Sequence, residues 1–327
     1  MKKLDIGVIG AGYWGKKIVE EYTELAKENQ EVNVQSVCDM DEENLFYCRE
    51  HFGITHTCHD YMEILENQDI DAVNICTPNE THYQICIDAL NANKHVLLEK
   101  PMTLKVSDAY ELVKLAEKRG LNLSVGHIFR FNNALREVRD LILEGSFGDL
   151  YYLDLQWITL FNAPNRDIIT DLAPHPFDIL NFLTGMWPER ITCTAKGYRS
   201  SNREEVAFIT SEFDDRVIGH MHLSWLLPGK TRRVRISGSQ GAAEIDCLSQ
   251  EVSISDGGKM HSIPVERNNT IRSELIHFLE CIRNRNGGQE YSNTANGVLG
   301  ARVVRLLEAA TGSCKEHKTV SVNYSET

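Results

Sequence analysis

The sequence predicts an α/β N-terminal domain with a parallel sheet, followed by an α+β domain with a mainly antiparallel open sheet. Residues 1–122 alternate apolar runs of strand length with helical patterns, which is typical of parallel βαβ units. From about residue 147, short runs alternate apolar and polar residues instead, as half-buried antiparallel strands do. The chain has 327 residues, which suits two domains, and we place them at 1–122 and 123–327.

A strand, a glycine turn and a helix start follow one another at the N-terminus. The apolar run from Leu4 to Ile9 leads into Gly10-Ala11-Gly12-Tyr13-Trp14-Gly15, a GxGxxG pattern. In such a turn the first glycine permits the tight bend, the second lets a pyrophosphate approach the backbone, and the third lets the helix lie close to the strand. The helix N-terminus then offers its N–H groups to the phosphates. The pattern predicts a dinucleotide-binding Rossmann domain.

An acidic residue stands at the end of the second apolar run. This run, 32–37, is followed by Cys38 and Asp39, and Asp39 lies 24 residues after Gly15. A carboxylate at this point of the fingerprint accepts hydrogen bonds from the adenosine ribose hydroxyls and repels a 2′-phosphate. Neither Met40 nor Asp41 is basic. The sequence therefore predicts NAD as the cofactor.

The remaining strands of the first domain also end in residues that suit ligand contacts. We expect strands at 72–76, 95–98 and 121–125, and helices at 41–52, 61–66, 83–91 and 107–119. In parallel sheets, ligands bind at the carboxyl ends of the strands. The segments at those ends are Thr77–Asn79, Glu99–Pro101 and Gly126–His127.

The second domain is expected to be a sheet with helices on one face. The predicted strands are 150–158, 191–198, 207–213, 217–225, 232–237, 242–247 and 251–255, and the predicted helices are 177–183, 271–285 and 294–310. His220 and His222 alternate with apolar residues, so they share one sheet face. Arg232, Arg233 and Arg235 indicate a solvated strand or an interface, with binding of a substrate phosphate as the alternative.

Composition excludes several classes of partner. The net charge is −13 without a long basic run, so nucleic acid and anionic membranes are poor partners. We expect no secretory signal and no membrane helix, since no apolar stretch nears the roughly 20 residues that a span needs. Nine cysteines without a CxxC spacing indicate reduced thiols and a cytoplasmic protein. The cluster His56, Cys58, His59 and Asp60 matches no zinc spacing, and we expect no metal.

With these motifs in hand, the chain resembles the glucose–fructose oxidoreductase, inositol dehydrogenase and rhizopine-catabolism family, Gfo/Idh/MocA, over nearly its whole length. The matching pieces are the glycine turn, Thr77-Pro78-Asn79-Glu80-Thr81-His82, Glu99-Lys100-Pro101, Gly126-His127 with Arg130-Phe131-Asn132, and Asp171-x-x-x-His175. The resemblance implies oxidation of a secondary alcohol of a sugar or cyclitol. It also implies a homodimer or homotetramer formed through the C-terminal sheet.

Three residues are expected to carry the chemistry. The resemblance implies that Lys100, held beside Pro101, is catalytic or orients the substrate, since a lysine can lower the pKa of a substrate hydroxyl. Asp171 and His175 are four residues apart, so on a helix they share a face, and such a pair can hold an imidazole as a general base. Whether Lys100 or His175 is the base stays open. The chain has Ala173 where many members have glycine, and Ile168-Ile169 where many have a glycine pair.

The other expected contacts follow the same motifs. Contacts to the cofactor are expected from Gly10, Gly12, Tyr13, Trp14, Gly15, Asp39, Thr77, Pro78, Asn79, His82, Glu99 and Lys100. Contacts to the substrate are expected from His127, Arg130, Asn132 and Arg166.

The substrate hypothesis is a nucleotide-linked hexose, specifically a UDP-N-acetylhexosamine oxidised at its 3-hydroxyl. It rests on a resemblance to the UDP-N-acetylglucosamine 3-dehydrogenase branch in the glycine turn, in residues 172–175 and in Ser224-Trp225. A diphosphate would suit Arg130 or Arg166. The alternatives are a myo-inositol or free-sugar dehydrogenase, and a non-catalytic NAD(H)-sensing protein.

Overall fold

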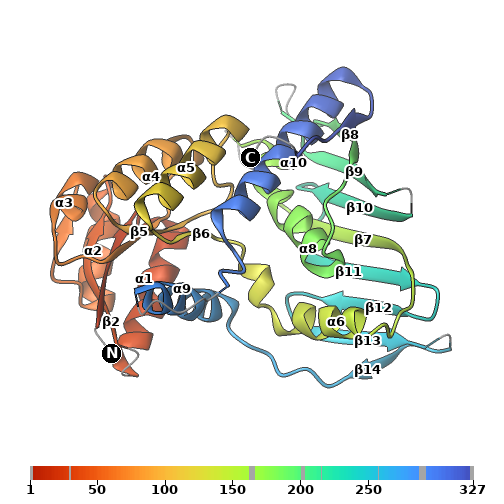
Figure 1. Cartoon of the computed structure of the whole chain (residues 1–327), viewed down its shortest axis with the longest axis horizontal. Helices are drawn as coiled ribbons and strands as arrows, with labels where there is room; N and C mark the ends of the chain where they lie inside the picture. Colours follow the sequence, from red (N-terminus) through yellow and green to blue (C-terminus); the bar gives the residue numbers. More distant parts are fainter. Residues whose placement is uncertain are drawn as a thin grey trace. The chain divides into compact units, whose positions relative to one another are not determined.

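Six parallel strands and the helices between them build the first of two units in the computed structural model (Figure 1). The structure describes residues 3–28, 31–161, 166–199, 203–214, 216–256, 258–286 and 292–324. The first unit contains residues 1–127 and 271–301, and the second contains 128–270 and 302–327. The predicted boundary at residue 122 cuts the chain once, whereas the two units divide it at three points.

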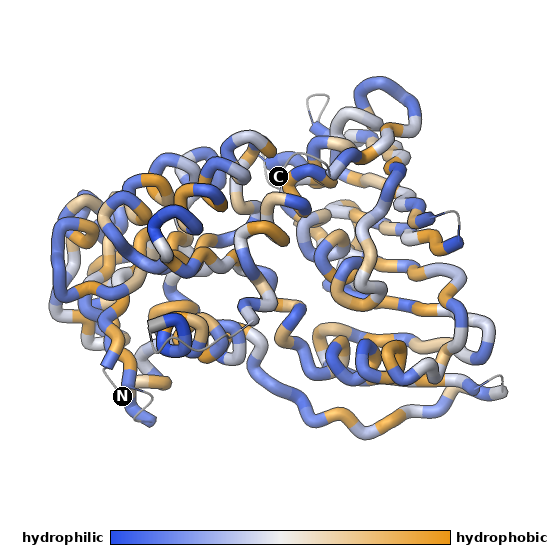
Figure 2. The backbone as a smooth tube through the Cα atoms, in the orientation of Figure 1, coloured by the Kyte–Doolittle hydropathy of each residue, from blue (hydrophilic) through white to orange (hydrophobic). Residues whose placement is uncertain are grey.

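The first unit has the strand order β3-β2-β1-β4-β5-β6, the order of a doubly wound nucleotide-binding sheet. Its strands are β1 (Leu4–Ile9), β2 (Val32–Cys38), β3 (Thr57–Cys58), β4 (Ala72–Ile75), β5 (His95–Leu98) and β6 (Leu123–Val125). Its helices are α1 (Tyr13–Lys27), α2 (Glu42–Phe52), α3 (Tyr61–Glu66), α4 (His82–Asn91) and α5 (Val106–Arg119), with a 3₁₀ turn η1 (Asn79–Thr81). These helices alternate hydrophilic and hydrophobic positions, as amphipathic helices on a sheet do (Figure 2).

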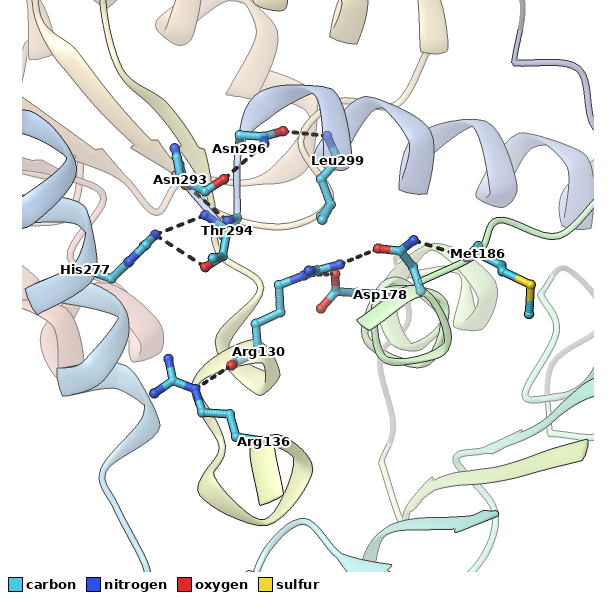
Figure 3. Close-up of polar contacts among 11 residues, drawn as sticks. Arg130, Arg136, Asp178, Met186, His277, Asn293, Thr294, Asn296 and Leu299 are labelled. Carbon is cyan, nitrogen blue, oxygen red and sulfur yellow. Dashed lines mark hydrogen bonds and ion pairs between the residues drawn. The ribbon is translucent and has the colours of Figure 1, made fainter. Parts of the chain in front are cut away.

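A helix from late in the chain completes the first unit. Helix α9 (Thr270–Asn286) follows the strands of the second unit in sequence, yet its apolar face joins the core formed with α1. Its buried contributors are Leu275, Phe278, Leu279 and Ile282. The start of α10 (Gly297–Glu316) is also anchored here, because His277 Nε2 accepts a hydrogen bond of 3.2 Å from the Thr294 N–H (Figure 3). The sequence analysis assigned both segments to the second domain.

The second unit is a nine-stranded mixed sheet with the order β14-β13-β12-β11-β7-β10-β9-β8-β15. Its strands are β7 (Leu150–Thr159), β8 (Arg190–Lys196), β9 (Val206–Phe213), β10 (Val217–Ser224), β11 (Lys230–Gly238), β12 (Ala242–Asp246), β13 (Glu251–Ser255), β14 (His261–Ile263) and β15 (Val320–Ser321). Every pair is antiparallel except β7 with β10, which is parallel. The expected mainly antiparallel sheet is confirmed, and the parallel pair is a departure that period-two patterns do not reveal.

The two faces of this sheet differ. The inner face is apolar and is contacted by α6 (Asn133–Leu143) and α8 (Pro174–Thr184), of which α6 was not predicted. A Cβ added to Gly219 of β10 would lie 2.7 Å from Leu180 of α8, so the helix lies against the strand. The outer face carries His220 and His222 together, as predicted, with Phe208 stacked on both rings. Phe208, Ile218 and Tyr152 leave this face partly apolar and exposed.

Candidate active site

The turn after β1 fits a dinucleotide phosphate through its backbone. Gly10 has φ +91°, in the left-handed region, and a Cβ on Gly15 would lie 1.9 Å from the Gly10 carbonyl oxygen, so neither position admits a side chain without strain. A Cβ on Gly12 would meet no atom within 4 Å. Helix α1 begins at Tyr13, and Gly12 offers no side-chain cap to it. Its first N–H groups therefore suit an anion, and the space over Gly12 suits a pyrophosphate.

Asp39 closes this turn from the end of β2. Its Oδ2 accepts the Ala11 N–H at 2.6 Å, and its Oδ1 accepts the Asp41 N–H at 2.8 Å. A carboxylate offers about four acceptor positions, so two remain for ribose hydroxyls. The ring of His59 contacts the Asp39 carbonyl oxygen at 3.0 Å and the Glu42 carboxylate at 3.2 Å. Among the described residues no group of three or more His, Cys, Asp or Glu side chains is arranged to hold a metal ion.

His82 links the loops that follow β4 and β5. The buried ring lies 2.9 Å from the Pro101 carbonyl oxygen through Nδ1 and 2.9 Å from the Thr77 carbonyl oxygen through Nε2. Burial lowers the pKa of His82, and a neutral imidazole donates to one carbonyl at a time. His82 therefore holds the two strand-end loops in register, and its expected contact with the cofactor stays a prediction.

Glu99 and Trp14 form a polar contact beside Lys100. The Trp14 indole N–H donates to Glu99 Oε1, and the Lys100 backbone N–H donates to Glu99 Oε2 at 3.2 Å. Burial raises the pKa of Glu99 to about 7, against the lowering effect of Lys100 and of these donors. This contact ties the first turn of α1 to the backbone that carries Lys100. Tyr13, next to Trp14, is exposed and lies under the Lys17 ammonium group.

In the second unit, one helical segment carries Asp171 and His175. Helix α7 (Ile168–Leu172) is capped by Asp167, whose side chain accepts the Thr170 N–H at 2.8 Å. Ala173 is helical, and the Phe177 N–H donates to its carbonyl oxygen, so α7 runs almost directly into α8. Asp171 and His175 are thus one turn apart, as predicted. Helix α8 begins at Pro174, three residues before the predicted start at 177, and proline is favoured in the first helical turn.

An aromatic chain leads away from His175. Its ring meets Phe129 edge to face at 5.0 Å between centroids, and Phe129 meets Trp157 at 5.2 Å. The Arg232 guanidinium lies over the Trp157 ring, 5.6 Å from its centroid. Arg232 is buried, and Asp171 exerts a favourable charge effect on it. The sequence analysis placed Arg232 with its two neighbours on a solvated strand or an interface.

Two of the four expected substrate contacts serve inside the second unit. Arg130 is buried, with Nε bonded to Asp178 at 2.6 Å and Nη2 bonded to Asn181 at 2.7 Å, and Figure 3 shows this network reaching Met186. The Asn132 side chain caps α6 through the Leu135 N–H and donates to the Cys247 carbonyl oxygen. Arg166 is exposed and lies 3.3 Å from Asp171. His127 is buried at the end of the segment that follows β6 in the first unit.

Comparison with known proteins identifies the class of this chain. Residues 4–127 match the oxidoreductase family with an NAD-binding Rossmann fold, and residues 135–244 match the GFO/IDH/MocA C-terminal domain. The chain therefore belongs to the Gfo/Idh/MocA family of oxidoreductases, and its cofactor is NAD. No helix of the described residues has both the length and the apolar character of a membrane span.

Three relatives show how far the similarity extends. The uncharacterized oxidoreductase YrbE of Bacillus subtilis is 25% identical over 99% of this chain and 98% of its own. The UDP-N-acetylglucosamine 3-dehydrogenase of Acidithiobacillus ferrooxidans is 26% identical over 84% of this chain and 88% of its own, and its crystal structure superposes with a TM-score of 0.85 over 97% of this chain and 99% of its own. The D-apiose dehydrogenase of Paraburkholderia graminis is 23% identical over all of this chain and 92% of its own.

Proposed function

We propose that this chain is an NAD-dependent dehydrogenase for a secondary alcohol of a sugar, with a UDP-N-acetylhexosamine oxidised at its 3-hydroxyl as the specific substrate. The observation that carries the proposal is the pair Asp171 and His175 on one helical turn, in a chain that also presents Lys100 after β5. The similarity to UDP-N-acetylglucosamine 3-dehydrogenase supports the choice of a nucleotide sugar.

The protein groups have distinct roles in this proposal. NAD, when bound, accepts the hydride from the alcohol carbon. Asp39 accepts the adenosine ribose hydroxyls, and the N–H groups at the start of α1 hold the pyrophosphate. The Lys100 ammonium lowers the pKa of the substrate hydroxyl by its charge, and His175 takes the hydroxyl proton as a general base. Asp171 favours the imidazolium that results. The reverse assignment, with Lys100 as the base, predicts a different pH profile.

A substrate panel tests the proposal. Wild-type protein and NAD are incubated with UDP-N-acetylglucosamine, myo-inositol and glucose at equal concentration, and the absorbance of reduced nicotinamide is followed. The nucleotide sugar is expected to turn over fastest. Turnover of the free polyols alone would replace the nucleotide-sugar assignment with a free-sugar or cyclitol dehydrogenase. An absence of hydride transfer with all sugars, together with tight NAD binding, would favour an NAD(H)-sensing protein.

We further propose a homodimer or homotetramer formed through the outer face of the second sheet. Phe208 and Ile218 are large apolar side chains exposed on that face, beside the His220–Asp154 contact of 3.0 Å. Light scattering on the wild type and on Phe208→Glu tests this, since a charge in an apolar contact disfavours association. A monomeric wild type would contradict it.

The free thiols of all nine cysteines support a cytoplasmic location.

A further inference from the structure

Arg232 occupies a position where the strand pattern calls for an apolar residue. On β11, Val234 and Ile236 face the apolar inner side of the sheet, and Arg232 shares their side with only 8% of its surface exposed. Arg233 and Arg235 point to the outer side, where both contact Glu244. One arginine of the three is therefore buried on the face that carries the helices.

The Arg232 side chain is held by hydrogen bonds through one of its three nitrogens, Nη1. Its Nη1 donates to the Ile158 carbonyl oxygen at 2.9 Å and to the Thr231 carbonyl oxygen at 2.8 Å. Among the described residues, no hydrogen bond of Nε or Nη2 is found, and 8% of the residue's surface stays exposed. The guanidinium thus keeps its Nε–H and both N–H groups of Nη2 available.

The buried charge of Arg232 is only partly balanced. Burial lowers the pKa of Arg232 to about 10, and Asp171 opposes this effect. At neutral pH the guanidinium therefore stays charged. No described carboxylate forms an ion pair with it. A buried cation without a bonded anion is costly, and the cost falls when an anionic ligand binds.

The position of Arg232 connects it to the proposed chemistry. Its guanidinium lies over Trp157, and Trp157 is joined through Phe129 to the His175 ring. Asp171, one helical turn before His175, has a larger favourable charge effect on Arg232 than the Cys247 thiol has. All of these residues belong to the second unit, so an anion bound at Arg232 would lie within the same cluster as the Asp171–His175 pair.

We propose that Arg232 is a specificity-determining residue that binds an oxyanion of the substrate, a carboxylate or a phosphate, through Nε and Nη2. The planar N–H fork of arginine matches two oxygens of either group. This inference rests on the proposed function, because it names the class of sugar that the second unit accepts: an anionic one. Neutral sugars lack the group that Arg232 would bind.

The test compares anionic with neutral sugars in Arg232 variants. Arg232→Met keeps the length without the charge, Arg232→Lys keeps the charge without the fork, and Arg233→Met is the matched control on the outer face. For UDP-N-acetylglucosamine we expect Arg232→Met to raise KM roughly 10- to 100-fold with kcat changed about 3-fold or less, since a hydrogen bond to a charged group is the interaction lost. Arg232→Lys should recover part of this, and Arg233→Met should resemble the wild type.

Neutral sugars provide the decisive contrast. The KM of N-acetylglucosamine, or the rate where saturation is not reached, should differ less than about 3-fold between Arg232→Met and the wild type. Equal losses for anionic and neutral sugars would assign Arg232 to fold maintenance and overturn the inference. Thermal unfolding of each variant identifies loss of fold. If Arg232→Met is unfolded, the comparison of anionic with neutral sugars is made with Arg232→Lys.

Calorimetry separates this inference from the proposed function. Wild-type protein loaded with NAD is titrated with UDP-N-acetylglucosamine, glucose 6-phosphate, glucuronate and glucose, which distinguishes a phosphate from a carboxylate requirement. Tighter binding of an anionic sugar that is lost in Arg232→Met supports the inference even if no sugar transfers hydride. Equal wild-type affinity for glucose and the anionic sugars overturns it, even if a sugar dehydrogenase activity is found.

Discussion

The Gly10–Gly15 turn and the helical segment 167–175 are both expected to hold a ligand, but they are built differently. The turn presents backbone: two of its glycines exclude any side chain, and its ligand groups are N–H donors and the Asp39 carboxylate. The segment presents side chains, Asp171 and His175, on two consecutive helices.

This difference separates what is general from what is specific. The pyrophosphate belongs to the cofactor and is the same for every substrate. We therefore expect the sequence of the backbone site that binds it to vary little. A site made of side chains changes its ligand when one residue changes. The following expectations probe the contrast, from the largest effect to the smallest.

One proton-handling group from each unit gives the largest expected loss. Lys100→Ala and His175→Ala should each reduce turnover roughly 10²- to 10⁴-fold, because each removes a group that we propose acts on the hydroxyl proton, while NAD affinity stays within about 3-fold. Steady-state rates and fluorescence titration with NAD measure the two effects. His261→Ala, at an exposed strand position, is the control. A variant with wild-type turnover would remove its residue from the mechanism.

Substitutions at two glycines of the turn should weaken NAD binding for different reasons. Gly15→Ala places a methyl 1.9 Å from the Gly10 carbonyl oxygen, so it should destabilise the protein by about 3 kcal/mol and abolish NAD binding. Gly12→Ala meets no protein atom, so the free energy of unfolding should change by about 0.5 kcal/mol or less while NAD binding weakens. Denaturant unfolding and NAD titration check both. Unchanged NAD affinity in Gly12→Ala would contradict the pyrophosphate site.

Glu99 should make the cofactor unit sensitive to pH. Burial raises its pKa from 4.5 to about 7, so between these values the folded state holds a proton that the unfolded state has lost. Stability contributed by Glu99 therefore falls as pH rises through this range, by up to about 3 kcal/mol. The unfolding free energy of Glu99→Gln, minus that of the wild type, should increase from pH 4.5 to pH 8. Glu66→Gln, at an exposed position, controls for removing one charge. A flat difference would contradict the expected protonation.

Cofactor choice should depend on Asp39. The wild type should bind NAD more tightly than NADP, because the carboxylate repels a 2′-phosphate. Asp39→Asn keeps an acceptor for the Ala11 N–H and loses the charge, so the ratio of NADP to NAD affinity should rise roughly 10-fold. Titration with both cofactors measures it. Equal or tighter binding of NADP by the wild type would refute this account.

Arg166 gives the smallest expected effect. Its contact with Asp171 is 3.3 Å long and largely solvent-exposed on the arginine side. Exposed ion pairs contribute little, so Arg166→Ala should change the free energy of unfolding by about 0.5 kcal/mol or less. Chemical denaturation tests this, and a substrate role would show instead as a raised KM at unchanged stability. A large loss of stability would mean that Arg166 braces the α7 segment.

The parts of the fold that local rules govern could be predicted from the sequence. The glycine turn, Asp39 and the strand-end segments depend on backbone geometry that few residues satisfy. Helix α3 was predicted at its observed bounds, Tyr61–Glu66, and in the structure the Asp60 side chain caps it by accepting the Met62 N–H. The packing partner of α9 could not be predicted, since an amphipathic pattern does not say which core its apolar face joins. The parallel pairing of β7 with β10 was not predicted for a similar reason, because an alternating pattern does not say whether the adjacent strand runs parallel or antiparallel.

Side-chain roles were harder to predict than positions. Arg130 and Asn132 lie in a family motif that does not reveal their contacts with Asp178, Asn181 and the α6 cap, and their substrate contacts stay predictions. Arg232 shows the opposite case. Its two-residue spacing from Val234 and Ile236 was a readable signal that it faces inward, unlike Arg233. The three arginines were treated as a group, and the period of the strand separates them.

The late position of α9 has a consequence for synthesis on the ribosome. Chains emerge N-terminus first, and domains generally fold as they emerge. Here the core of the first sheet needs Leu275, Phe278, Leu279 and Ile282, which are made only after every strand of the second sheet except β15. The apolar surface of α1 that α9 covers therefore stays exposed through most of translation. A nascent chain halted near residue 260 should be a client of chaperones, whereas one halted after residue 327 should not.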